Sequence, residues 1–184
     1  MYNKNKSTMY TEILKFFPVF FNYTPEDWKN LTFALITRDF HHRSEEMMSD
    51  ITNKIGFQIV FAASYNVKPI AKELYAEHNA SHNGGTCRPF FPGLVKTMSS
   101  GPSKILLLHH EPVKQVIAKE LVIKLCYELW RDVIGPKNPR EGSMDTLRHN
   151  YYFQEHGTDY SFYDSGDGTN GFHGSDGLLA AALE

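Results

Sequence analysis

Near its C-terminus the chain reads Asn170-Gly171-Phe172-His173-Gly174-Ser175-Asp176, and the interpretation of the whole sequence starts from this stretch. A histidine stands there among small residues, in a segment with little apolar bulk to bury it. An imidazole that is neutral near pH 7 is a competent nucleophile. Gly174 leaves room for a large reactant, and Ser175 and Asp176 can orient the ring nitrogen that does not react. The same residues also fit an exposed histidine in a glycine-rich turn, so the motif alone leaves both interpretations open.

The order of other motifs along the chain favours the first interpretation. The pattern Asn-x-x-His-Gly-Ser-Asp resembles the active-site motif of nucleoside diphosphate kinases. Further landmarks of that family follow in the family's order: Thr32–Asp39, Arg88–Val95, Ser100–Pro102, Trp130-Arg131 with Gly135–Pro139, and Asp145–Arg148. The resemblance implies an α/β fold, a ferredoxin-like sandwich in which an antiparallel sheet is covered by helices.

The resemblance also implies a reaction and a set of site residues. Members of the family move the γ-phosphate of a nucleoside triphosphate onto a nucleoside diphosphate in two steps, through a phosphohistidine. His173 matches that nucleophile, and arginines suit phosphate because the guanidinium is always charged and forks onto its oxygens. The remaining matches are Ser175 near the nucleophile, Phe90 and Leu94 at the base, Arg131 and Arg148 at the phosphates, and Asn170 near the ribose 3′-hydroxyl.

Four positions depart from the family pattern. Thr37 stands where the family has a lysine that reaches the transferring phosphate, and Asn79 stands where it has a tyrosine. Lys137 replaces a phosphate-contacting threonine, which suggests the hypothesis that it returns the positive charge lost at Thr37. A ring-orienting glutamate of the family corresponds by spacing to Glu184, in a segment that resembles vector-encoded sequence. Two functions therefore stay open: a phosphotransferase, or a weakly active or inactive nucleotide-binding scaffold that keeps the fold.

Composition limits the other possibilities. The 184 residues carry 41% apolar and 22% charged side chains and a formal net charge of −2, which fits one globular domain without a broad basic surface. We therefore expect neither a specific nucleic acid nor a membrane as partner. Cys87 and Cys126 are too few for a disulfide framework, which indicates a reducing, cytoplasmic location. No metal site of the protein's own is expected, and Mg²⁺ should arrive with the nucleotide. By resemblance the protein is a homo-oligomer, a hexamer in most family members.

The chain divides into three expected parts: an N-terminal extension at 1–30, the kinase-like domain at 31–178, and a short vector-like tail at 179–184. Apolar runs predict strands at 31–37, 57–63 and 105–108. Helical spacing predicts helices at 44–55, 69–78 and 89–99, and a longest helix over 113–134. Residues 135–170 are rich in Gly, Pro, Asp and Tyr and are expected to be mainly loop. The segments 102–131 and 148–170 are longer than the family pattern, so each contains an insertion.

Overall fold

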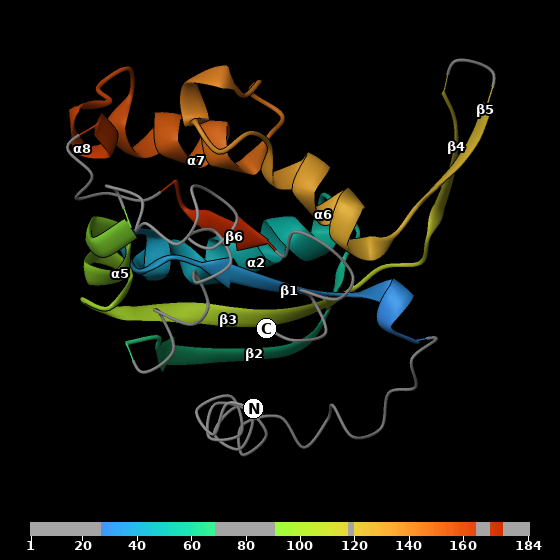
Figure 1. Ribbon diagram of the computed structural model, residues 1–184, viewed down its shortest axis with the longest axis horizontal. Helices are drawn as coiled ribbons and strands as arrows, with labels where there is room; N and C mark the ends of the chain where they lie inside the picture. Colours follow the sequence, from blue (N-terminus) through green and yellow to red (C-terminus); the bar gives the residue numbers. More distant parts are fainter. Residues whose placement is uncertain (1–26, 69–90, 118–119, 165–169, 175–184) are drawn as a thin grey trace, which may run out of the picture.

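A four-stranded antiparallel sheet organises the structure, a computed structural model that describes residues 27–68, 91–117, 120–164 and 170–174 (Figure 1). Its strands stand in the order β2-β3-β1-β6. Their bounds are Leu31–Ile36 for β1, Gln58–Asn66 for β2, Pro102–His109 for β3 and Phe172–Gly174 for β6. The three-residue β6 forms one edge by pairing with β1, so a stretch from the C-terminal part of the chain lies beside the first strand.

Helices pack on this sheet, and the expected antiparallel sheet covered by helices is confirmed. The longer helices are α2 (Ser44–Asn53), α5 (Phe91–Met98), α6 (Cys126–Ile134) and α7 (Leu147–His156). Shorter turns are η2 (Asp27–Asn30), η3 (Arg38–Arg43), η5 (Pro139–Glu141) and α8 (Ser161–Asp164). Figure 1 shows α6 and α7 running above β6, which makes them the natural supports of that strand.

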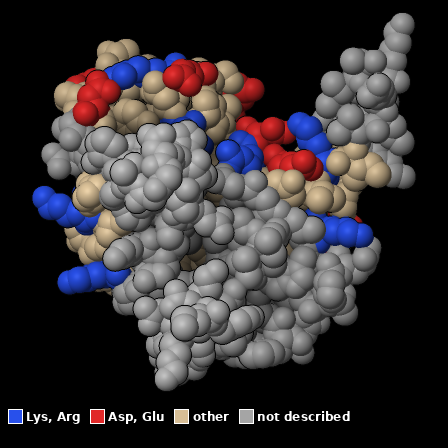
Figure 2. All heavy atoms as spheres, in the orientation of Figure 1, with Lys and Arg blue, Asp and Glu red and all other residues tan. Residues whose placement is uncertain are grey.

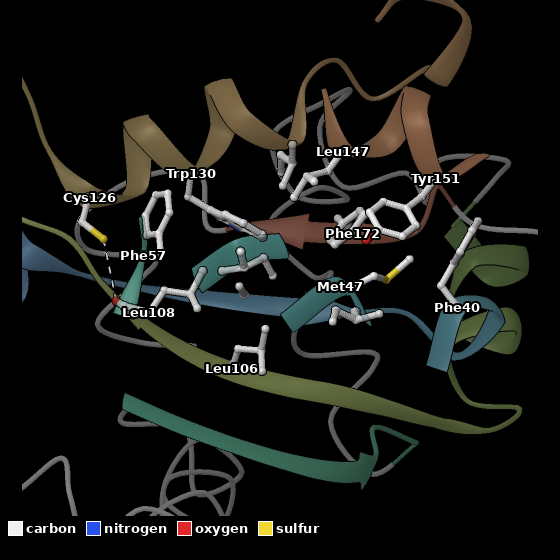
Figure 3. Close-up of a cluster of buried hydrophobic side chains, with 14 of the residues drawn as sticks. Phe40, Met47, Phe57, Leu106, Leu108, Cys126, Trp130, Leu147, Tyr151 and Phe172 are labelled. Atoms are coloured by element: carbon white, nitrogen blue, oxygen red, sulfur yellow. Dashed lines mark hydrogen bonds between the residues drawn. The ribbon is translucent and has the colours of Figure 1, made fainter. Parts of the chain in front are cut away.

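The core lies between α2, α6, α7 and one face of the sheet (Figure 3). Side chains alternate across a strand, so Ala34 and Ile36 of β1 face the helices and Leu35 faces away. The apolar cluster also takes in Trp130 of α6 and Tyr151 of α7, both at most 1% exposed. Burying such aromatic side chains contributes roughly 2–3 kcal/mol each, so the helix-covered face supplies much of the stability.

The predicted helix over 113–134 is wrong in its first half. Residues Val113–Ile117 form β4 and Glu120–Lys124 form β5, an antiparallel hairpin that makes its own two-stranded sheet. Among the described residues of this span, the helical ones are Cys126–Ile134, which form α6. The apolar residues of the hairpin happen to match a helical period, but six of them are Val, Ile or Leu, and the β-branched ones lose side-chain freedom in a helix. The β-branched composition of this segment predicts strands correctly, whereas the spacing of its apolar residues predicts a helix.

The expectation of loop over 135–170 is also wrong in part. The segment contains η5, the ten-residue α7 and the short α8. The buried face of α7 is built from Leu147, Tyr151 and Tyr152 and not from an aliphatic stripe. Tyrosine buries its ring while its hydroxyl finds a partner, and Tyr151 donates to Asp50 Oδ2 at 3.0 Å. A count of aliphatic residues therefore missed this helix.

The first two predicted strands and the first predicted helix are confirmed within a few residues, and β3 is longer than expected. The helix predicted at 89–99 is observed as α5. The predicted helix at 69–78, Asn79, residues 1–26 of the extension, and the tail at 179–184 lie outside the described residues.

The surface agrees with a chain that is nearly neutral. On the face shown in Figure 2, positive and negative side chains of the described residues are intermixed and form no single-sign field. In the part of the chain that the structure describes, no helix has both the length and the apolar composition to cross a bilayer.

Candidate active site

His173 lies in the middle of β6, in register with Leu35 of β1. Neighbouring residues of a strand point to opposite faces, so Phe172 enters the helix-covered core while His173 points to the other face. There the imidazole meets the Phe33 ring edge-to-face, with ring centroids 6.3 Å apart, and the residue is 8% exposed. The histidine is thus fixed on a sheet, which excludes the alternative of an exposed turn residue.

The two backbone carbonyls that flank the Cα of His173 are both held by helix side chains. From α6, Trp130 Nε1 donates to the His173 carbonyl at 3.2 Å. From α7, Arg148 donates to the Phe172 carbonyl through Nε at 3.2 Å and Nη2 at 2.9 Å. Its Nη1 donates to the Gly135 carbonyl at 2.6 Å. Because buried backbone carbonyls require donors, these contacts fix a strand that is only three residues long.

Glycines on both sides of His173 permit this close packing. Gly171 has φ +88°, which L side chains rarely adopt, and its carbonyl accepts from the Thr37 backbone at 2.9 Å. A Cβ on Gly174 would lie 2.6 Å from Trp130 Cδ1 and 2.7 Å from its Nε1. Gly174 therefore makes room for the indole whose N–H donates to the His173 carbonyl.

The turn after α6 is hydrogen-bonded to Asn170, the first residue of the motif. Asn170 Nδ2 donates to the Lys137 carbonyl at 2.8 Å. The same carbonyl accepts from the Tyr163 hydroxyl of α8 at 3.4 Å, a long contact. Burial raises the pKa of Tyr163, so its hydroxyl keeps its proton and can donate. The Lys137 side chain itself is exposed, so its ammonium is accessible from solvent.

Hydrogen bonds link Lys137 to Asn170, at the start of the motif, and Arg148 to Phe172, next to His173, in both cases through a backbone carbonyl and not through the imidazole. Arg131 is exposed on α6, one residue after Trp130. Leu94 belongs to α5, but its side chain is outside the described part, and Phe90 and Ser175 are outside the described residues altogether. Their predicted roles stay predictions.

Sequence reasoning missed the role of Trp130 and the backbone contacts of Arg148. A tryptophan that is completely buried needs an acceptor for its indole N–H, and this was the available signal for Trp130. At the position of the family's lysine, Thr37 is 2% exposed and its side chain is neutral. Among the described residues no group of three or more His, Cys, Asp or Glu side chains is arranged to hold a metal ion.

Comparison with known proteins identifies the family. The model of the family described as nucleoside diphosphate kinase matches residues 30–184. The nucleoside diphosphate kinase of Methylocella silvestris is 30% identical over 155 residues, which cover 83% of this chain and 88% of the relative. That of Coxiella burnetii (strain CbuK_Q154) is 34% identical over 132 residues, 71% of this chain and 72% of the relative.

Solved structures extend the similarity to the fold. The nucleoside diphosphate kinase of Aquifex aeolicus superposes with a TM-score of 0.57 at 25% identity, covering 83% of this chain and 89% of that one. The enzyme of Borrelia burgdorferi, solved with vanadate and ADP, gives 0.61 at 18% identity and covers 84% and 83%. The chain belongs to the nucleoside diphosphate kinase family.

Proposed function

We propose that this protein transfers the γ-phosphate of a nucleoside triphosphate to a nucleoside diphosphate through a phosphohistidine at His173. The observation that carries the proposal is the anchoring of both carbonyls that flank the His173 Cα, by Trp130 and by Arg148. A nucleophile that must attack phosphorus in line needs a fixed backbone, because small misplacements lower the rate strongly.

In the first step the imidazole nitrogen forms a bond to the γ-phosphorus and the bond to the β,γ-bridging oxygen breaks, which releases the diphosphate. In the second step an oxygen of the incoming diphosphate takes the phosphoryl group from His173. Charge on the phosphoryl oxygens requires cations placed in advance. We assign this role to Arg131 and Lys137, together with the positive charge of Arg148 beside β6.

The nucleotide contacts follow the family pattern. The relative from Halobacterium salinarum was solved with CDP and the one from Borrelia burgdorferi with ADP, which supports nucleoside di- and triphosphates as the ligands. We assign the base to Phe90 and Leu94, the ribose to Asn170, and a contact near the nucleophile to Ser175. Stacking on an aromatic ring accepts any base, so broad nucleoside use is expected.

Mg²⁺ would be held mainly by phosphate oxygens and water. When bound, the ion would neutralise charge on the phosphates. We further propose that the protein is cytoplasmic and works as a homo-oligomer, as the family pattern implies.

A nucleotide-binding scaffold is the second candidate function, and one observation favours it. Thr37, in the place of the family's lysine, is 2% exposed and neutral, and so brings no charge to a phosphate. The two candidates differ in whether a phosphoryl group leaves the nucleotide at all.

Initial rates with ATP and GDP varied together test the proposal. A ping-pong enzyme gives parallel double-reciprocal lines, and His173→Ala abolishes turnover. For the charge hypothesis, Lys137→Thr should raise KM and lower kcat, while Lys68→Thr, an exposed lysine next to the opposite sheet edge, should change neither. Nucleotide binding without turnover in the intact chain would leave the scaffold as the function.

A further inference from the structure

The β4–β5 hairpin contributes none of the candidate site residues. It lies in the first insertion and extends away from the main sheet (Figure 1). Within the described residues, β4 and β5 pair with each other and with no other strand. A two-stranded ribbon is marginally stable alone in water, and its open strand edge presents unpaired backbone donors and acceptors.

The sequence of β5 is suited to pairing with a second copy of itself. The strand reads Glu120-Leu121-Val122-Ile123-Lys124. Two such strands that run antiparallel about a two-fold axis at Val122 place Glu120 of one copy opposite Lys124 of the other, twice. The same register sets Leu121 opposite Ile123. Opposite charges and apolar pairs at directly opposed positions are both stabilising.

Two other symmetric pairings of the hairpin lack this complementarity. A parallel arrangement of β5 places Glu120 opposite Glu120 and Lys124 opposite Lys124, which is repulsive. The edge of β4 about its central Gln115 sets Lys114 opposite Val116 and so forms no charge pair. Of these three symmetric arrangements, only the antiparallel pairing of β5 with itself sets opposite charges against each other.

The exposure of Ile123 and the unprotected edge of β5 fit the same arrangement. Ile123 is 53% exposed, although an isoleucine in a strand favours burial. β5 contains no proline, and no register shift interrupts its pairing with β4, so it lacks two common devices that protect open edges. Lys124 also contacts Asp132 of α6, which holds this end of the strand to the body of its own subunit.

We propose that two copies of this chain associate through their β5 strands, forming a continuous four-stranded antiparallel sheet with its two-fold axis at Val122. The interface is isologous, so the same residues contribute from both subunits. It lies in an insertion relative to the family pattern and does not depend on the catalytic proposal.

Charge reversal tests the register directly. Glu120→Lys and Lys124→Glu, the latter always combined with Asp132→Lys so that residue 124 keeps its ion pair within the subunit, should each weaken this association about tenfold, because two symmetric pairs become repulsive at once. The double reversal should restore it. An equimolar mixture of the two single variants should also associate, since each then supplies the charge that the other lacks. Sedimentation velocity of the full chain over a concentration series measures all four cases.

Cross-linking gives an independent readout that other subunit contacts do not affect. In a Cys87→Ser background, Val122→Cys should form a disulfide dimer on mild oxidation, because the axis places the residue opposite its own copy. Gln115→Cys, which stands opposite Val122 on β4, is the matched control and should not. Absence of the Val122 cross-link, or single reversals that leave the assembly unchanged, would overturn the proposal. Weakening by both reversals without rescue in the mixture would overturn the register. Phosphotransfer by a chain that fails these tests would leave the catalytic proposal intact.

Discussion

Gly174→Ala is the substitution whose effect follows most directly from the structure. The new Cβ would lie 2.6 Å from Trp130 Cδ1 and 3.2 Å from Ile134 Cδ1, both closer than ordinary van der Waals contact. Trp130 is completely buried, so the indole has no free space into which to move. Overpacking of this kind costs about 1–3 kcal/mol. Displacing the indole also breaks its hydrogen bond to the His173 carbonyl, worth about 1 kcal/mol.

We therefore expect the free energy of unfolding to fall by about 2–4 kcal/mol, measured by urea denaturation. Gly93→Ala is the matched control, because no atom lies within 4 Å of its Cβ position and it sits inside α5. Alanine there should leave stability unchanged or raise it by up to about 1 kcal/mol. If Gly174→Ala is as stable as the wild type, Trp130 does not pack against β6 as described. The argument that Trp130 holds the backbone of His173 in place then fails.

Three further predictions concern the same framework. Trp130→Phe keeps an aromatic ring but removes the N–H, so it should lose about 1 kcal/mol of stability and lower kcat with little change in KM; an unchanged kcat would limit Trp130 to packing. Arg148→Lys keeps the charge but cannot bridge the Phe172 and Gly135 carbonyls, so the free energy of unfolding should fall by about 1–3 kcal/mol. Wild-type stability of the lysine variant would show that these hydrogen bonds do not hold β6. Burial raises the pKa of the Cys126 thiol to about 12. As the pH rises above about 9, the thiol therefore ionises first in the unfolded chain, and the free energy of unfolding should fall. This one group lowers it by up to ~1.4 kcal/mol per pH unit. A smaller pH dependence in Cys126→Ala, measured by denaturation between pH 8 and 11, checks this, and an identical slope would refute it.

How far the sequence could predict the fold depended on the kind of residue that builds each element. The first strand was predictable because Leu31–Ile36 is a short apolar run that ends at charged residues, as a buried strand requires. The hairpin was not, because Val113, Val116, Ile117 and Ile123 satisfy a helical period by coincidence. Spacing cannot separate the two cases in a short apolar run, and β-branched composition decides for the strand.

In the candidate site, too, some residues could be predicted from the sequence and others could not. His173, Asn170 and Arg148 could be named as candidates because a contiguous motif and ordered landmarks contain them. The carbonyl contacts of Trp130 and Arg148 could not, since they join α6 and α7 to a strand up to 43 residues away in the chain. Such contacts depend on tertiary packing, which no local pattern encodes. The short polar strand β6 was equally invisible, because only its partner β1 makes it a strand.

The most direct test of the central claim is whether the chain forms a phosphoenzyme at His173. The protein would be incubated with γ-labelled ATP and Mg²⁺, quenched, and examined for acid-labile label in the peptide that contains residue 173, with His173→Ala as control. We predict label in the wild type alone, removed on addition of a nucleoside diphosphate with formation of the labelled triphosphate. Measurable ATP binding without any label would contradict the account and identify the protein as a nucleotide-binding member of the fold.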